Sequence, residues 1–222
     1  MDAALETSVT NPDKTLIAAL LDRSGSMQAS KTATEDGWRE LINEQRHQPG
    51  RCDVTLAQFD TVYELLYPPT DIGTVPEFIV APRGMTALLD STGRFITEVG
   101  ELLSALPEDD RPGQVICMIM TDGMENSSTE WTWESVRDLI SRQRDQWNWR
   151  FIFLGSNIDA VEIGTKMGVA AEDSITYDDS TYMSTVAVSA AASSWMSSAR
   201  AGRPTGFSDA DRAAAMGGRS ET

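Results

Sequence analysis

Three oxygen-bearing side chains follow an apolar run near the N-terminus at alternate positions. In IAALLDRSGSM (residues 17–27), Asp22 ends the aliphatic run, and Ser24 and Ser26 follow it with Gly25 between them. A continuous aliphatic run is typical of a strand that is buried on both faces. In a sheet covered by helices on both faces, ligands bind outside the carboxyl ends of the strands. We therefore predict that this turn contributes to a binding site for a ligand that prefers oxygen donors.

Two later segments place further oxygen donors at the same predicted sheet edge. Thr86 stands directly before a predicted helix in RGMTALLD, and Asp122 ends a second apolar run in MIMTDGMEN. Two carboxylates that lie close together repel each other unless a cation lies between them. Because all the donors are hard oxygens, the cation should be hard as well. We expect Mg²⁺, with Mn²⁺ or Ca²⁺ as alternatives, and the predicted ligands are Asp22, Ser24, Ser26, Thr86 and Asp122.

Other binding motifs are missing from the sequence. No GxGxxG follows the first apolar run and no GxxxxGK[ST] occurs, which excludes the dinucleotide fingerprint and the Walker loop. His47 is the only histidine, and the two cysteines, Cys52 and Cys117, stand in separate apolar runs without a CxxC pair. These residues do not have the spacing of a zinc site, so we predict that both thiols are free and buried.

The composition limits the partners and the compartment. The 222 residues carry a net charge of −16, which argues against binding to nucleic acid or to anionic membranes. The N-terminal residues do not resemble a signal peptide, and no apolar run approaches the ~20 residues that cross a membrane. Together with two unpaired thiols, this predicts a cytoplasmic protein without membrane insertion, and association with a virion is an alternative.

Predicted strands and helices alternate along most of the chain. Strands are expected at 15–22, 52–60, 62–67, 114–120, 150–156 and 174–179, and helices at 31–46, 87–106, 132–147, 159–168 and 181–199. The very short link at residue 61 requires an antiparallel hairpin, whereas the strands separated by helices favour parallel pairing. We predict an α/β fold with a doubly wound, mostly parallel six-stranded sheet and helices on both faces. The expected organisation is a flexible arm at 1–13, one domain at 14–200 that includes an Ala/Ser-rich helix, and a flexible tail at 201–222.

Taken together, the three polar segments resemble the metal-ion-dependent adhesion site of von Willebrand factor A domains, such as integrin inserted domains. The match consists of DxSxS after the first strand, Thr86 before a later helix and Asp122 in TDG, and it spans about residues 15–178. The resemblance implies the strand order 3-2-1-4-5-6 with an antiparallel edge strand. It also implies that the serines, and in one state Thr86, bind Mg²⁺ directly, while the aspartates act largely through water.

Three functions are compatible with these residues. The first is a divalent-metal-dependent protein-interaction module, not an enzyme, that binds an acidic side chain of a protein partner; basic or neutral residues should surround that side chain. A structural subunit of a larger phage or bacterial particle, with an architectural metal site, is the alternative. A Mg²⁺-dependent phosphohydrolase is a further alternative, but no general base stands out, and Ser24 occupies the position where a second acidic residue would be expected. The oligomeric state stays open.

Several residues near the same edge are candidates for contacts with the partner. They follow predicted strands or the TDG segment, and they are Asp60, Met124, Glu125, Asn126, Ser156 and Asn157. Trp131 and Trp133 stand close to this edge as well, and exposed aromatic residues are frequent interaction hot spots. Trp133 matches the apolar face of the following helix and is predicted to be in the core, while the role of Trp131 stays open.

Overall fold

The computed structural model describes residues 10–156 and 158–218. In this part of the chain, six strands form one sheet of order β3-β2-β1-β4-β5-β6, as predicted. The strands are β1 (Asn11–Asp22), β2 (Arg51–Phe59), β3 (Tyr63–Asp71), β4 (Pro112–Thr121), β5 (Trp149–Ser156) and β6 (Ser174–Tyr177). β2 and β3 form the predicted antiparallel hairpin, whereas the other neighbouring strands pair in parallel. The predicted fold class is therefore confirmed.

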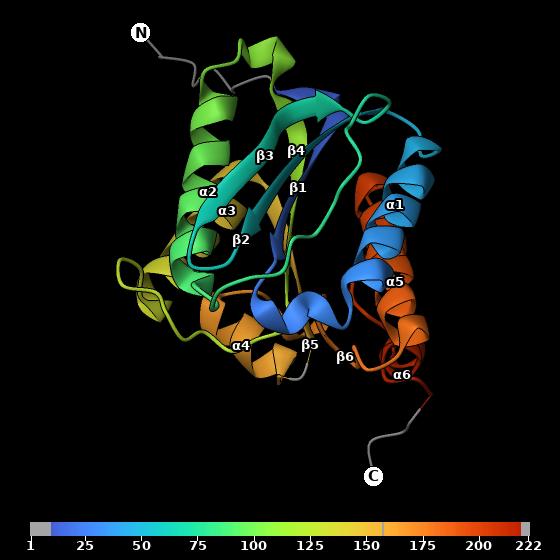
Figure 1. Ribbon diagram of the computed structural model, residues 1–222. Helices are drawn as coiled ribbons and strands as arrows, with labels where there is room; N and C mark the ends of the chain where they lie inside the picture. The colour runs from blue at the N-terminus through green and yellow to red at the C-terminus, as the bar shows by residue number, and fades with distance from the viewer. Residues whose placement is uncertain (1–9, 157, 219–222) are drawn as a thin grey trace, which may run out of the picture.

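Helices cover both faces of the sheet (Figure 1). They are α1 (Lys31–Arg46), α2 (Leu88–Ser104), α3 (Trp133–Trp147), α4 (Ala160–Met167), α5 (Tyr182–Arg200) and α6 (Asp209–Ala215). α1, α5 and α6 lie on one face, and α2, α3 and α4 lie on the other (Figure 1). Among the described helices, none is long and apolar enough to cross a membrane.

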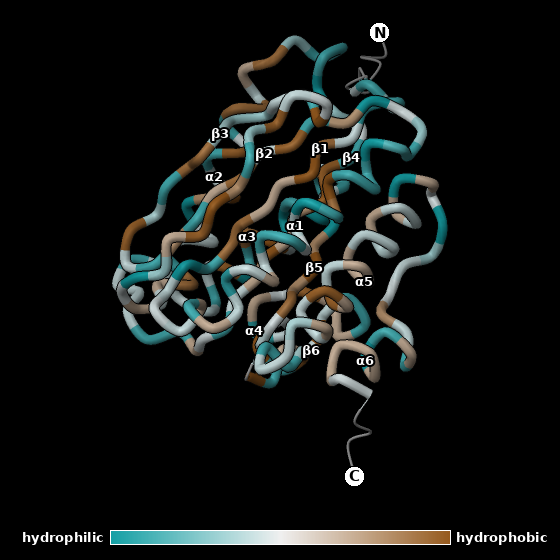
Figure 2. Tube along the Cα trace, turned by 45° about the vertical axis from the view of Figure 1, so that its right-hand side comes forward, coloured by the Kyte–Doolittle hydropathy of each residue, from teal (hydrophilic) through white to brown (hydrophobic). Residues whose placement is uncertain are grey.

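The central strand β1 supplies both halves of the core. Ile17, Ala19 and Leu21 face the core on the α1 side, while Leu16 and Leu20 face the core on the α2 side. This alternation explains the unbroken aliphatic run, because both faces of β1 are buried. The hydropathy colouring shows the same apolar centre in the neighbouring strands (Figure 2). Both cysteines are buried and free, as predicted.

α1 and α5 approach closely at a glycine. A Cβ atom on Gly37 of α1 would lie 2.3 Å from Oγ and 2.9 Å from Cβ of Ser189 in α5. Farther along the same contact, Nε2 of Gln45 donates hydrogen bonds to the carbonyl oxygen of Ser193 and the hydroxyl of Ser197, at 2.9 Å each. Small residues therefore bring α5 close to α1, and the buried amide of Gln45 is satisfied across the contact.

Gly37→Ala should lower the free energy of unfolding by about 1–3 kcal/mol, because the added methyl group overpacks the contact with Ser189. Gly100→Ala is a matched control in α2, where the nearest atom to the added Cβ, Nε2 of Gln143, lies 3.8 Å away. That variant should be stabilised by roughly 0.5–1 kcal/mol, because alanine is the better helix former. Urea unfolding measures both values, and equal changes in the two variants would contradict the tight α1–α5 contact.

The chain ends differ from the predicted arm and tail. β1 begins at Asn11, whose backbone N–H donates to the carbonyl oxygen of Arg111 at 2.8 Å, so the domain starts earlier than residue 14. The predicted flexible tail is wrong for the segment that includes α6. Ser208 caps α6 in a capping box, and Phe207 and Ala215 are buried in the core on the α1 side. These contacts provide enough apolar burial and capping to order a segment whose composition suggested a loop. Residues 1–9 and 219–222 lie outside the described part.

Candidate metal centre

The parallel pairing of β1 with β4 brings the two predicted aspartates to the same edge of the sheet. Leu21 pairs with Met120, so Asp22 and Asp122 follow at the adjacent strand ends, and both are buried. Directly after β1, a single 3-10 turn (Gly25–Gln28) is anchored by the buried side chain of Met27. This short turn presents the serines toward β4.

Both serine hydroxyls converge on Asp122. The Ser24 and Ser26 hydroxyls lie 3.0 Å apart, and they donate to Oδ1 of Asp122 at 3.2 and 2.7 Å. The carboxylate of Asp22 is held from two sides. Its Oδ1 accepts the backbone N–H of Ser24 at 2.6 Å, and its Oδ2 accepts the hydroxyl of Thr121 at 2.5 Å. Four of the five predicted ligands are thus joined by hydrogen bonds.

Thr86 reaches the same place from a separate loop. A Cβ atom on Gly123 would lie 2.9 Å from Oγ1 of Thr86 and 3.9 Å from Oγ of Ser26. Gly123 therefore lies beside both hydroxyls, and any larger residue there would press against Thr86. Asn126 fixes the backbone of Thr86, because its Oδ1 accepts the Thr86 N–H at 3.0 Å and its own N–H donates to the Thr86 carbonyl at 3.1 Å.

The charges at this edge favour a cation. Burial raises the pKa of Asp22 to about 6; hydrogen bonds from Thr121 and Ser24 oppose this rise, and repulsion from Asp122 adds to it. Burial likewise raises the pKa of Asp122, against the hydrogen bonds from the two serines. Among the described residues, Oδ2 of Asp122 is buried without a hydrogen-bond partner. A buried, unpartnered carboxylate oxygen normally requires compensation by a donor or a positive ion.

The donor set fits a hard divalent cation. Within residues 10–156 and 158–218, no three His, Cys, Asp or Glu side chains form a group that could hold a metal ion. Two carboxylates alone are therefore not sufficient, and the neutral hydroxyls of Ser24, Ser26 and Thr86 would have to complete the coordination. Such an all-oxygen set suits Mg²⁺, which usually keeps several waters and binds only one or two carboxylates.

The predicted contact residues have different environments. Met124 is exposed, as a partner-contacting residue should be. Glu125 instead links the start of α2 to its own loop, since its carboxylate accepts the backbone N–H groups of Leu89, Ser127 and Ser128 at 2.8 Å each. Asn126 is exposed but serves Thr86, as described above. Ser156 is fully buried at the end of β5, which argues against its predicted contact with a partner. Asn157 lies outside the described residues.

The two tryptophans after the TDG segment pack against the core and are partly buried. Trp131 and Trp133 both lie against the core on the α2 side, which confirms the prediction for Trp133. The indole of Trp131 lies directly on α2, where a Cβ atom on Gly93 would be only 2.1 Å from the ring. Trp131 therefore anchors the loop before α3, and the hydroxyl of Thr132 begins that helix by accepting the N–H of Ser135, as expected for a cap.

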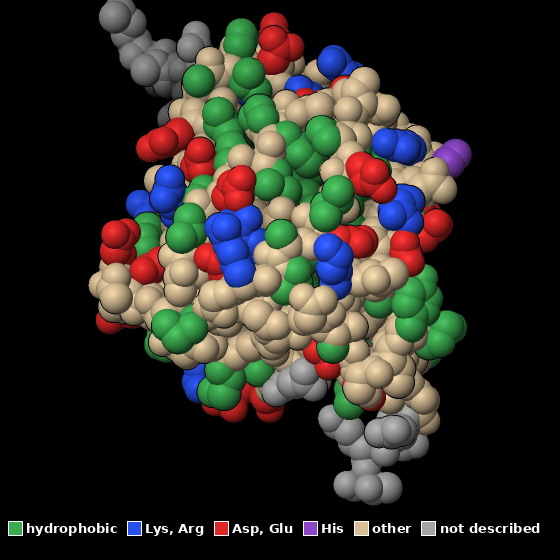
Figure 3. Space-filling model, viewed as in Figure 1, with side chains coloured by type: hydrophobic (Ala, Val, Ile, Leu, Met, Phe, Trp, Pro, Cys, Tyr) green, Lys and Arg blue, Asp and Glu red, His purple; other side chains and the backbone are tan. Residues whose placement is uncertain are grey.

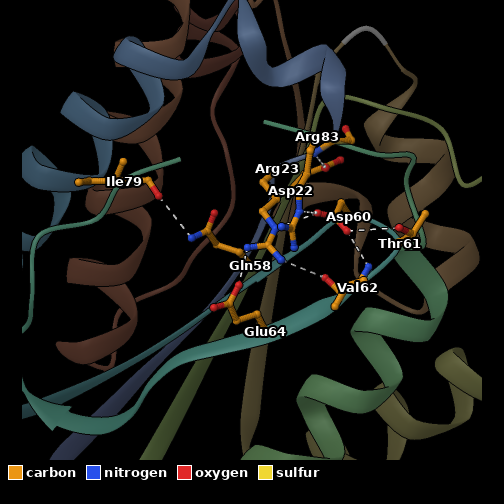
Figure 4. A network of polar contacts seen from close by, with 10 residues as sticks. Asp22, Arg23, Gln58, Asp60, Thr61, Val62, Glu64, Ile79 and Arg83 are labelled. Atoms are coloured by element: carbon orange, nitrogen blue, oxygen red, sulfur yellow. Dashed lines mark hydrogen bonds and ion pairs between the residues drawn. The ribbon is translucent and has the colours of Figure 1, made fainter. Parts of the chain in front are cut away.

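Asp60 was predicted to line the rim, but it lies in a buried ion-pair network (Figure 4). Its Oδ2 accepts hydrogen bonds from Nε of Arg23 at 3.0 Å and from Nε of Arg83 at 2.7 Å. Burial alone would raise the pKa of Asp60, but these two guanidinium groups and the N–H of Val62 hold it below its usual range. Neither arginine was predicted from the sequence to contribute to this edge. Arg23 could have been identified, because a charged residue between two predicted ligands at the end of a buried strand indicates a buried ion-pair partner.

Exposed apolar side chains stand on loops at the same edge of the sheet as the predicted ligands. Val62, Met85 and Met124 are 54%, 56% and 65% exposed, and each belongs to a loop at this edge of the sheet. Met85 directly precedes Thr86, and sequence reasoning did not identify it or Val62. On the face shown in Figure 3, basic side chains occur in small separate groups among acidic and apolar ones. That face therefore lacks the continuous basic patch that nucleic-acid binding uses.

Comparison with known proteins supports the fold. No protein-family model and no curated protein sequence matches the chain. Proximal thread matrix protein 1 from the mussel byssus is similar in structure, with a TM-score of 0.61 and 14% identity over 83% of this chain and 46% of that one. The pilus adhesin SpaC from Lactobacillus rhamnosus GG, in its open conformation, has a TM-score of 0.62 and 12% identity over 86% of this chain and 30% of that one.

A von Willebrand factor type A structure from Catenulispora acidiphila is similar as well, with a TM-score of 0.57 and 14% identity over 84% of this chain and 42% of that one. At such identities the likeness shows the fold alone, and this chain shares the fold of von Willebrand factor A domains. It spans less than half the length of each of these three proteins. Another structure of the mussel protein has zinc in its MIDAS motif, the metal-ion-dependent adhesion site.

Proposed function

We propose that this chain, which has the von Willebrand factor A fold, is a divalent-metal-dependent protein-interaction module and not an enzyme. Asp122 carries the proposal. Its Oδ1 gathers the hydroxyls of Ser24 and Ser26, while its Oδ2 is buried and unpartnered among the described residues. A divalent ion would compensate this carboxylate and that of Asp22. The proposed ligands, direct or through water, are Asp22, Ser24, Ser26, Thr86 and Asp122.

The neutral hydroxyls determine what the site can bind. If the hydroxyls bind Mg²⁺ directly and the two aspartates act largely through water, the bound ion would keep much of its positive charge and attract an acidic side chain from a partner. The protein supplies the orientation: Thr121 and the Ser24 backbone hold Asp22, and Asn126 holds Thr86. These contacts would hold the oxygen donors in place before an ion binds.

The surroundings favour a partner whose acidic residue is flanked by apolar and by basic or neutral residues. Met85 and Met124 present flexible, polarizable side chains on two of the three ligand-bearing segments, and such side chains adapt to varied apolar surfaces. The net charge of −16 repels an acidic partner at long range. Screening limits this repulsion to about 8 Å at physiological salt, so the contact with the ion should dominate at close range.

A library of displayed loops tests the partner class directly. One library has a fixed central Glu among random residues, and its matched control has Gln at the same position. We expect clones to be enriched in Mg²⁺ only from the Glu library, with apolar residues beside the Glu, and to be released by EDTA. Equal enrichment from both libraries, or binding that persists in EDTA, would contradict a metal-bound carboxylate. Phosphatase and ATPase assays should show no Mg²⁺-dependent rate above that of Asp122→Asn.

A further inference from the structure

The carboxylate of Asp60 connects the first serine loop with the loop that carries Thr86. Asp60 stands at the end of β2, Arg23 lies between Asp22 and Ser24, and Arg83 precedes Thr86 by three residues. Both guanidinium groups donate to the same oxygen, Oδ2, while Oδ1 accepts the N–H of Val62 at 2.7 Å. Figure 4 shows the two arginines converging on Asp60 from separate segments. One buried side chain thus connects its own turn with two other segments at the predicted metal edge.

Backbone hydrogen bonds join the same segments. The N–H of Arg83 donates to the carbonyl of Arg23 at 2.8 Å, and the N–H of Gly25 donates to the carbonyl of Gly84 at 3.2 Å. On the other side of Thr86, the N–H of Ala87 donates to the carbonyl of Asp60 at 3.0 Å. The backbone and side chain of Asp60 therefore hold the Thr86 loop both before and after Thr86.

Gly84 makes this close approach possible. It has a φ of +71°, and a Cβ atom placed there would lie 3.3 Å from Cβ of Asp60. The loop is thus pressed against Asp60, in a backbone conformation that glycine adopts without strain. The Arg23 side chain is itself buried and pairs at its other end with Glu64, where Nη1 lies 2.5 Å from Oε2. Because a buried arginine without a partner is costly, Arg23 and Asp60 should keep each other in place.

We propose that Asp60 is a positioning residue of the metal site, which sets the place of the Thr86 hydroxyl relative to Ser24 and Ser26 without touching the ion. This inference rests on the proposed function, because it concerns how the same site holds its metal. Asp60 acts through Arg83 and the backbone of residues 84–87. Glu64 shares the network through its ion pair with Arg23, and it affects Arg83 only by a weaker electrostatic interaction, so we expect it to have little influence on the Thr86 loop.

Mn²⁺ titration of the full chain tests the proposal. Asp60→Asn should bind Mn²⁺ about 10- to 100-fold more weakly than the wild type, the loss that is typical of residues supporting metal ligands. Glu64→Gln is the matched control and should bind within about twofold of the wild type, since it alters the network away from the Thr86 loop. Arg83→Gln should weaken binding as well. Its side chain is 59% exposed, so this variant should fold even if Asp60→Asn does not.

A double-mutant cycle with Thr86→Ala separates positioning from a general loss of structure. If Asp60 acts through Thr86, Asp60→Asn should weaken Mn²⁺ binding much less when Thr86 is already alanine. Water-proton relaxation should also show more water on Mn²⁺ bound to Asp60→Asn, because water replaces the displaced hydroxyl. Additive losses, or wild-type affinity in both Asp60→Asn and Arg83→Gln, would overturn this inference alone. A wild-type chain that binds neither Mn²⁺ nor Mg²⁺ would overturn the proposed function together with it.

Discussion

Asp122→Asn should abolish the stabilisation of this protein by Mg²⁺, while the metal-free variant at pH 7 should be at least as stable as the metal-free wild type. The wild-type carboxylate is buried, its Oδ2 has no hydrogen-bond partner among the described residues, and its pKa is raised by burial. An amide keeps one oxygen for the serine hydroxyls and removes the buried charge. The same substitution removes the charge that would bind the cation, so stability and metal binding should change in opposite directions.

Thermal unfolding with and without Mg²⁺ measures both effects. At a concentration about 100 times the Kd, Mg²⁺ should stabilise the wild type by roughly 2.7 kcal/mol, which raises Tm by roughly 5–10 °C for a chain of this size. Asp122→Asn should show no rise. Asp138→Asn, on the exposed side of α3, is a control with the same change in charge and should respond like the wild type. A rise in the Tm of Asp122→Asn similar to that of the wild type would contradict the proposed role of Asp122.

The stability of the metal-free protein should fall more steeply between pH 4 and pH 7 than that of Asp22→Asn. Burial raises the pKa of Asp22 from 3.8 to about 6, so the folded chain binds this proton more tightly than the unfolded chain does. The resulting stabilisation is complete at low pH and is lost as the pH rises through about 6. The shift corresponds to a difference of up to about 3 kcal/mol.

Urea unfolding of both proteins across this pH range isolates the contribution of Asp22, because the other carboxyl groups titrate in both. Mg²⁺ competes with the proton for Asp22, so Mg²⁺ binding to the wild type should weaken as the pH falls below about 6. Saturating Mg²⁺ should also remove most of the loss of stability near pH 7. Parallel pH profiles of the metal-free wild type and Asp22→Asn would show that Asp22 keeps an ordinary pKa and would contradict this prediction.

Local patterns in the sequence were sufficient to predict the strands of the sheet and the hairpin, and they indicated which polar residues follow those strands; the strand order came from the family resemblance. The aliphatic runs that end at Asp22 and before Asp122 mark strands buried on both faces, and the short link after Asp60 requires a hairpin. Since the carboxyl ends of adjacent parallel strands meet at one edge, the polar residues after them had to meet there as well. The strands and the hairpin depend on residues that are close in the sequence, so they can be predicted without knowledge of the packing, whereas the meeting of the polar residues also depends on the pairing of β1 with β4.

Only the tertiary structure decided which polar side chains near the predicted metal site are free to contact a partner and which make hydrogen bonds or ion pairs within the protein. Asp60 and Glu125 both resemble exposed acidic residues in the sequence. In the structure, Asp60 pairs with Arg23 and Arg83, and Glu125 accepts N–H groups from the start of α2 and from its own loop. The composition suggested a tail at the C-terminal end, but the structure has α6 there. Phe207 and Ala215 are buried in the core on the α1 side, and this burial orders the segment. The partners of Asp60 and Glu125 are distant in the sequence: Arg23 is 37 residues from Asp60, and Leu89 is 36 residues from Glu125. Whether a carboxylate faces solvent or pairs with a buried guanidinium depends on how segments that are distant in the sequence pack together. A local pattern of residue types does not contain this information.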